Sequence, residues 1–173
     1  MSAGVSLTGS IDDAWAALSG GWKLIDVNAE SVESGIIMES PGPTSDDWRV
    51  FLILRGERKE RPELESFAIH SQAFSQAIAA LQEGQDLVAL TWNSRGVISV
   101  LNDTRGRILT NDAFVNGARA AGISGSGSAI VIFAPSISIP TCERLIEWYS
   151  KFDDIEIIET TIINSEIEND DEQ

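Results

Sequence analysis

The sequence has little of what disulfide-bonded, zinc-thiolate and membrane proteins need. Its 173 residues include one cysteine, Cys142, which excludes an internal disulfide and a cysteine-based zinc cage. The longest unbroken apolar run, at 129–134, is far shorter than the roughly 20 residues of a membrane-spanning helix. The first residues lack the charged start and apolar centre of a signal peptide. We therefore expect a cytoplasmic protein.

Positive charge is also scarce, because 12 Lys and Arg residues against 27 Asp and Glu residues give a net charge of −15. Nucleic acids and anionic membranes attract basic proteins, so binding to either is the least favoured function. The last ten residues, 164–173, are rich in acidic side chains and have little to bury, which predicts a disordered acidic tail. The apolar share of 43% is enough to build a core.

Hydrophobic periodicity and turn residues predict an α+β protein with helices packed on a mostly antiparallel sheet. Strands are expected at 22–28, 32–38, 48–54, 129–134 and 155–163, and helices at 10–19, 63–83, 109–121 and 138–151. A bend is expected near His70. The stretch 86–101 is ambiguous, because Gly96 interrupts a helical pattern and 97–100 favours a strand. The loop at 39–46 is the strongest break in the chain.

The first segment that could carry chemistry is Thr-Gly-Ser-Ile-Asp-Asp-Ala at 8–14, which is followed by two glycines at 20–21. Acidic residues in the first turn of a helix are stabilised by the helix dipole and need no further function. The same field would hold a carboxylate ionised, ready to orient a substrate hydroxyl or accept its proton. The pattern alone favours the capping interpretation for both Asp12 and Asp13.

The second segment is Gly-Ile-Ser-Gly-Ser-Gly-Ser at 122–128. Its spacing is similar to that of phosphate-binding loops, but those loops lead from a strand into a helix. The predicted order here is helix, loop, strand, so the negative end of the preceding helix would face the loop. A flexible helix-to-strand turn and a nest of backbone N–H groups around an anion both fit this pattern.

Basic side chains gather once, after the predicted strand at 48–54: Arg55, Arg58, Lys59 and Arg61. They fit a solvated turn that is balanced by nearby glutamates. They also fit a contact from Arg58 or Lys59 to the carboxylate or phosphate of a bound ligand. Cys142 has no candidate partner base and is interpreted as a packing residue.

Together and in this order, the segments resemble the GHMP kinases (galactose, homoserine, mevalonate and phosphomevalonate kinases), and within them the archaeal-type shikimate kinases. The resemblance rests on 8–14 with its glycine pair, on Asn93, and on Ala-Ala-Gly-Ile-Ser-Gly-Ser-Gly-Ser-Ala at 120–129. It extends from about residue 5 to about residue 164. Ser128 stands where the family usually has proline, which is expected to loosen the turn.

The resemblance implies that ATP, with Mg²⁺, phosphorylates the 3-hydroxyl of shikimate in chorismate and aromatic amino-acid biosynthesis. Asp12 would be the catalytic base or orienting residue. Substrate-binding candidates are Asp13, Arg58, Lys59 and Asn93, and the loop beside the phosphate is formed by Gly125, Ser126 and Gly127. No metal ligand within this chain is assigned.

The resemblance also implies the architecture. Residues 1–46 would form the end of the N-terminal lobe, with the Asp-Asp-Ala helix and a β-hairpin, and 47–163 a ferredoxin-like C-terminal α+β domain. The principal ATP loop of the superfamily, Pro-x-x-x-Gly-Leu-x-Ser-Ser-Ala, is not found in this sequence. We therefore expect an incomplete or split kinase whose partner is a separate nucleotide-binding lobe. This chain alone should have little activity, and Trp15, Leu18 and Trp22 should form an exposed apolar face.

Two alternatives remain open at this point. The chain could serve a kinase for another small hydroxyl substrate, such as homoserine or mevalonate. It could also be a non-catalytic small-molecule-binding or interaction domain that kept the fold and lost the nucleotide lobe. Binding of shikimate without turnover of ATP would favour this second alternative.

Overall fold

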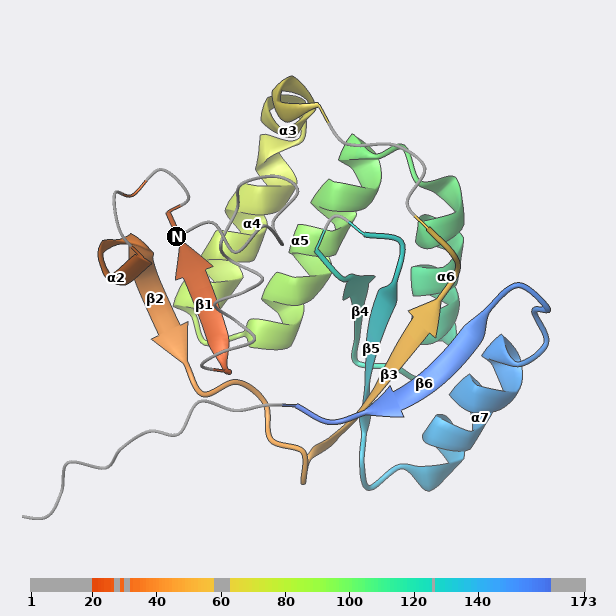
Figure 1. Cartoon of the computed structure of the whole chain (residues 1–173). Coiled ribbons are helices and arrows are strands. Elements are labelled where there is room, and N and C mark those ends of the chain that lie inside the picture. The colour runs from red at the N-terminus through yellow and green to blue at the C-terminus, as the bar shows by residue number, and fades with distance from the viewer. Residues whose placement is uncertain (1–19, 27–28, 30–31, 58–62, 126, 163–173) are drawn as a thin grey trace, which may run out of the picture. The chain divides into compact units, whose positions relative to one another are not determined.

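The computed structural model describes residues 20–26, 29, 32–57, 63–125 and 127–162 (Figure 1). The chain divides into two compact units. The first unit contains the first two strands of the chain, and the second unit is formed by Ser45–Thr161. The predicted helix at 10–19 and the predicted acidic tail at 164–173 lie outside the described residues. The proposed domain boundary at residue 46 stays a prediction.

The first unit contains a two-stranded antiparallel sheet of β1 (Trp22–Ile25) and β2 (Ile36–Ser40). The strand predicted at 32–38 is wrong in its first half, because Val32–Gly35 forms the short helix α2. The chain turns at Gly35, where the Asp26 N–H donates to the Gly35 carbonyl oxygen at 2.7 Å. Trp15 and Leu18 of the expected apolar face lie outside the described part, and Trp22 is half-buried.

The second unit is built on a four-stranded antiparallel sheet in the order β4-β5-β3-β6. Its strands are β3 (Trp48–Leu54), β4 (Ala120–Ile123), β5 (Ile130–Pro135) and β6 (Glu156–Thr160). One helical segment connects β3 to β4 and a second connects β5 to β6, while β4 and β5 form a hairpin. This β-α-β-β-α-β order, with the first and third strands of the unit paired in the centre of the sheet, is the ferredoxin-like topology that was expected.

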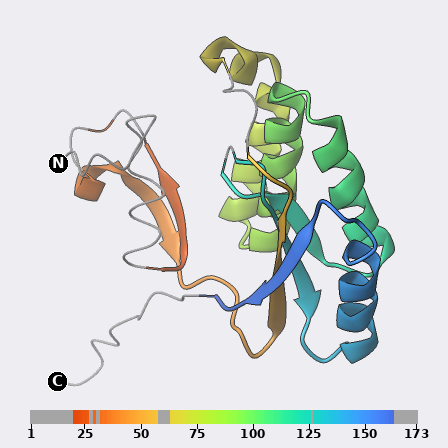
Figure 2. The ribbon, with the colours of Figure 1, turned by 45° about the vertical axis from the view of Figure 1, so that its right-hand side comes forward.

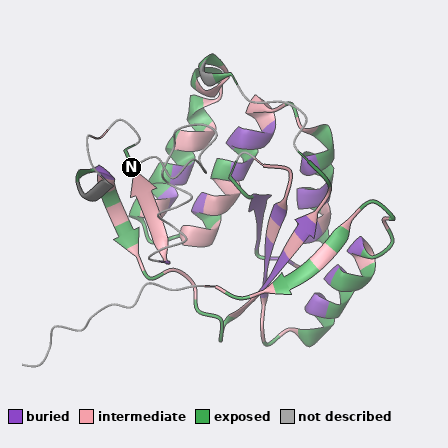
Figure 3. Ribbon diagram, in the orientation of Figure 1, coloured by how far each residue is buried: buried purple, intermediate pink, exposed green. Residues whose placement is uncertain are grey.

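The register of the strands places the core side chains on the face of the sheet that the helices cover (Figure 2). Phe51 and Ile53 of β3 pair with Ile132 and Ile130 of β5, and all four are completely buried. Side chains of a strand alternate between faces, so these pairs point to one side. Figure 3 shows the buried residues concentrated on these central strands and on the helix faces toward them.

The helical segment after β3 contains α3 (Leu64–Ile69), α4 (Ser71–Gln82), α5 (Asp86–Val100) and α6 (Thr104–Val115). The bend predicted near His70 is confirmed, because His70 separates α3 from α4. The ambiguity at 86–101 is resolved as one continuous helix. Burial of Val97 and Ile98 against the core outweighs their weak preference for strands. No helix in the described ranges is long and apolar enough to cross a membrane.

Gly96 stands inside α5 because α4 packs closely there. A Cβ atom at this position would lie 2.6 Å from the ring of Phe74, closer than real Cβ contacts allow. The glycine therefore reflects helix packing, and it does not interrupt the helix.

The helix predicted at 109–121 is wrong at both ends. Asp103 caps α6 at its start, and Asn116 with Gly117, whose φ is +101°, ends it well before residue 122. Residues 120–123 form the strand β4, which the sequence does not reveal because Ala-Ala-Gly has no β-branched pattern. Pairing with β5 makes this segment a strand.

The last helix, α7 (Ile139–Tyr149), agrees with the prediction at 138–151 and has Pro140 in its first turn. Its buried face carries Cys142, Leu145 and Tyr149, each with no exposed surface. The interpretation of Cys142 as a packing residue is confirmed by its place in the core.

A matched pair of substitutions tests this orientation of α7. Leu145→Ala removes a completely buried side chain and should lower the free energy of unfolding by about 2–5 kcal/mol. Ile146→Ala, at the neighbouring position that is 37% exposed, should lower it much less. Urea denaturation followed by circular dichroism measures both, and equal losses would contradict the described helix face.

Candidate functional site

The glycine-serine loop connects two paired strands, β4 and β5, and this corrects the prediction of a helix-to-strand turn. The prediction failed because it extended the preceding helix through β4. The argument that the negative end of a helix faces the loop therefore no longer applies. The loop is a hairpin connection at one end of the sheet.

Two backbone hydrogen bonds and two glycines make this hairpin tight. The Ser124 N–H donates to the Ala129 carbonyl oxygen at 2.9 Å, and the Gly127 N–H donates to the Ser124 carbonyl oxygen at 3.1 Å. Gly125 has a φ of +58°, a conformation that favours glycine. A Cβ atom at Gly127 would lie 3.2 Å from the Ser124 carbonyl oxygen, which is tighter than most real contacts.

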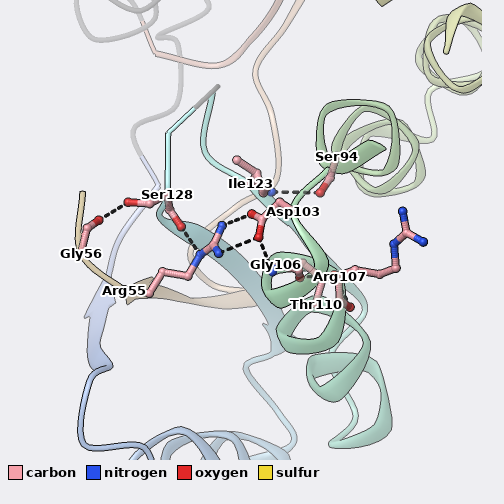
Figure 4. Close-up of polar contacts among 9 residues, drawn as sticks. All are labelled: Arg55, Gly56, Ser94, Asp103, Gly106, Arg107, Thr110, Ile123 and Ser128. Carbon is pink, nitrogen blue, oxygen red and sulfur yellow. Dashed lines mark hydrogen bonds and ion pairs between the residues drawn. The ribbon is translucent and has the colours of Figure 1, made fainter. Parts of the chain in front are cut away.

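Arg55, directly after β3, ties the loop to the start of α6 (Figure 4). Its Nε donates to the Ser128 carbonyl oxygen, and its two terminal nitrogens form a bidentate pair with the Asp103 carboxylate. The side chains of Arg55 and Asp103 are only 8% and 17% exposed. Arg55 is therefore a structural residue, and the suggestion that it belongs to a solvated turn is wrong.

The Asp103 carboxylate also caps α6, because it accepts a hydrogen bond from the Gly106 N–H at 2.7 Å. Burial by itself would raise the pKa of Asp103. The hydrogen bonds from Arg55 and Gly106, together with the charges of Arg55 and Arg105, outweigh that effect and lower the pKa below its usual range.

Gly106 leaves room for this pair. A Cβ atom there would lie 2.4 Å from an Asp103 carboxylate oxygen and 3.1 Å from an Arg55 nitrogen. The ion pair and the small residue at the start of α6 therefore depend on one another.

Ser128 is fixed in place, although it stands where proline was expected. Its hydroxyl donates to the Gly56 carbonyl oxygen, and its own carbonyl accepts from Arg55. These two contacts hold the end of the loop against the segment after β3, so the expected loosening of the turn is offset.

The other side of the hairpin is held by α5. The Ile123 N–H donates to the buried Ser94 hydroxyl at 3.0 Å. A Cβ atom at Gly122 would lie 2.8 Å from Leu90 and 3.0 Å from Ser94 Cβ, so only glycine lets the helix approach this closely. Ser94 was missed in the sequence, because nothing local separates it from the exposed polar residues around it.

Within the described residues, the N–H groups of Gly125 and Ser128 donate to no protein acceptor. Two unpaired N–H groups in a tight loop can donate hydrogen bonds to the oxygens of an anion such as phosphate. The loop therefore offers backbone donors to a ligand without help from a helix dipole.

The remaining predicted site residues are placed as follows. Gly125 and Gly127 lie in the hairpin loop, whereas Asn93 is an exposed residue of α5 next to Ser94. Asp12, Asp13, Arg58, Lys59 and Ser126 lie outside the described residues. The described ranges contain no group of three or more His, Cys, Asp and Glu side chains placed to hold a metal ion.

The fold is similar to parts of larger solved enzymes. Homoserine kinase from Cytophaga hutchinsonii matches 90% of this chain with a TM-score of 0.53 and 18% identity. Mevalonate diphosphate decarboxylase from Staphylococcus aureus matches 88% with a TM-score of 0.57 and 12% identity. The fold is thus similar to part of each of these enzymes, and the chain spans about half of their length, 52% and 54%. No protein-family model matches the chain, and no curated protein is detectably similar in sequence.

Asp103→Asn tests the importance of the ion pair. Asparagine keeps the helix cap but loses the charge, which leaves the largely buried Arg55 guanidinium without a counter-ion, so the free energy of unfolding should fall by about 2 kcal/mol. Asp154→Asn is the control, because it removes the partner of Arg105 in an exposed pair and should change stability little. Equal effects of the two substitutions in urea denaturation would contradict a special role for Asp103.

The pKa of Asp103 also predicts a pH dependence. Because this pKa is lowered on folding, the ionised carboxylate stabilises the protein above the unfolded-state pKa of about 3.9, and this stabilisation disappears as pH falls through the folded-state pKa. The stability difference between the wild type and Asp103→Asn should be constant from about pH 7 to pH 5 and shrink below about pH 4. A stability difference between the two proteins that grows as pH falls would contradict a lowered pKa for Asp103.

Proposed function

We propose that this chain supplies the C-terminal part of an ATP-dependent small-molecule kinase, and that the acceptor is shikimate. The observation that carries the proposal is the segment at 120–129. Its sequence resembles the glycine loop of archaeal-type shikimate kinases, and it forms a tight, braced hairpin in a fold that is part of a GHMP kinase.

The proposed roles follow the chemistry of phosphoryl transfer, which depends mainly on positioning and on charge stabilisation. Asp12 orients the acceptor hydroxyl or accepts its proton, with Asp13 beside it. The loop that contains Gly125–Gly127 faces the phosphate, with the N–H groups of Gly125 and Ser128 as donors. ATP supplies the phosphoryl group, and Mg²⁺ neutralises phosphate charge when it is bound.

Fold alone does not select the reaction, because the matched structures include both a homoserine kinase and a mevalonate diphosphate decarboxylase. Homoserine and mevalonate are therefore the acceptors to test beside shikimate. Since the chain spans about half of these enzymes, we propose that a separate nucleotide-binding lobe completes the site.

The first experiment reads the DNA upstream of the codon for Met1 and co-expresses any adjacent frame that encodes the glycine-serine ATP loop. We expect ADP formation that depends on shikimate in the presence of both chains. Homoserine-dependent or mevalonate-dependent ADP would replace the proposed acceptor. Shikimate binding with no ADP formation by the complete assembly would favour the non-catalytic alternative.

In the active assembly, Asp12→Asn should lower turnover by about 10²-fold or more, because it removes the group that handles the hydroxyl proton. Asp153→Asn, at an exposed position of the second unit, is the matched control and should leave turnover unchanged. Circular dichroism confirms that both variants fold. Near-normal turnover of Asp12→Asn would remove Asp12 from the mechanism.

A further inference from the structure

A cavity of about 300 Å³ lies between α5 and α6, with Ala121 of β4 also lining it. Its lining follows helical spacing. Thr91, Arg95 and Ser99 lie four residues apart on α5, and Arg107 and Asn111 lie four residues apart on α6. Residues at this spacing share one face of a helix, so two polar stripes, each with an arginine, face the same space.

The charge of this cavity differs from that of the chain. Its lining residues include two arginines and no Asp or Glu, although the whole chain has a net charge of −15. Nine of the 12 basic residues are described, and five of these form ion pairs with carboxylates. Arg95 and Arg107 have no carboxylate partner within the described ranges. Like charges that share a cavity repel each other, so an anion between them would be stabilised.

The hydrogen-bond donors available to a ligand can be identified by elimination. The hydroxyls of Thr91, Ser99 and Thr110 already donate to carbonyl oxygens of their own helices. The arginines, the Asn111 amide and the Ser94 hydroxyl, which only accepts a hydrogen bond from the Ile123 N–H, remain as donors. The Arg95 guanidinium lies 4.8 Å from the centre of the Trp92 ring, and this cation–π contact restricts its position.

Arg107, on α6, is separate from the ion pair between Arg55 and Asp103. Figure 4 shows the Arg107 side chain extending from α6 away from Arg55. Arg107 therefore takes no part in the ion pair between Arg55 and Asp103.

The cavity also has an apolar part, formed by Ile98, Phe114 and Ala121. A volume of about 300 Å³ is at the small end of ligand sites. We propose that this cavity binds a small organic anion, with its phosphate or carboxylate held by Arg95 and Arg107 and its apolar body on Ile98 and Phe114. Of the kinase candidates that the structure describes, Asn93, Gly125 and Gly127 do not line the cavity, so the inference rests on other residues than the proposed function.

The test is calorimetric titration of the full chain at low salt with phenyl phosphate, benzoate and inorganic phosphate. Phenyl phosphate should bind more tightly than inorganic phosphate, because the ring adds apolar contact. Comparing the affinity for benzoate with that for phenyl phosphate shows whether the site prefers a carboxylate or a phosphate, because both ligands carry the same ring. Arg107→Gln and Arg95→Gln should each lower the affinity for the ligand that binds most tightly by about tenfold or more, because each removes a charge-assisted hydrogen bond.

Arg119→Gln is the matched control, because Arg119 is an exposed arginine outside the cavity that also lacks a carboxylate partner in the described part of the chain. It should leave affinity unchanged. Amide chemical shifts from ¹⁵N spectra should change at residues 94–99 and 107–111. The proposal fails if no probe binds at millimolar concentration, if Arg119→Gln weakens binding as much as Arg107→Gln, or if the shifts are confined to the loop at 124–128.

Discussion

The bidentate pair between Arg55 and Asp103 is the interaction on which the candidate site depends. It joins three segments that are distant in sequence: the end of β3, the start of α6 and, through the Ser128 carbonyl oxygen, the glycine-serine hairpin. The same carboxylate caps α6, so one side chain fixes both the helix start and the loop. A charge pair with so little exposure stabilises a fold only when all of its polar atoms are satisfied, and here the backbone groups of Gly106 and Ser128 complete it.

This arrangement explains the small residues around the hairpin. Gly106 makes room for the carboxylate, and Gly122 lets Ser94 reach the Ile123 N–H from α5. These contacts hold both ends of the loop, which reduces the entropy that would be lost when a ligand binds. The arrangement also commits Arg55 to a structural role, since three of its five N–H groups donate to Asp103 and Ser128. Recognition of phosphate at this loop would therefore rest on backbone N–H groups.

Much of the architecture could be predicted from local patterns. The buried strands β3 and β5, the bend at His70 and the helix after Ser138 each have a periodic or capping signal in their own residues. The strand β4 could not be predicted in this way, because Ala-Ala-Gly becomes a strand only through pairing with β5. The Arg55–Asp103 pair joins residues separated by 48 positions, so no local pattern contains it. A local signal for Asp103 did exist, namely an aspartate in the N-cap position three residues before a backbone N–H that needs an acceptor.

The distribution of the few basic residues limits how this chain can recognise an anion. At a net charge of −15 the long-range field repels anionic ligands, so attraction has to come from short-range donors. Five of the nine described Lys and Arg side chains are paired with carboxylates, and the donors at the two candidate sites are of two kinds: backbone N–H groups at the hairpin, and Arg95 with Arg107 between α5 and α6. The first kind carries no charge and is fixed by the fold, whereas the second carries charge and is mobile apart from the stacking of Arg95 on Trp92. Added salt would weaken the second kind more strongly, because backbone dipoles are screened less than full charges, and the two sites are therefore physically separable within one chain.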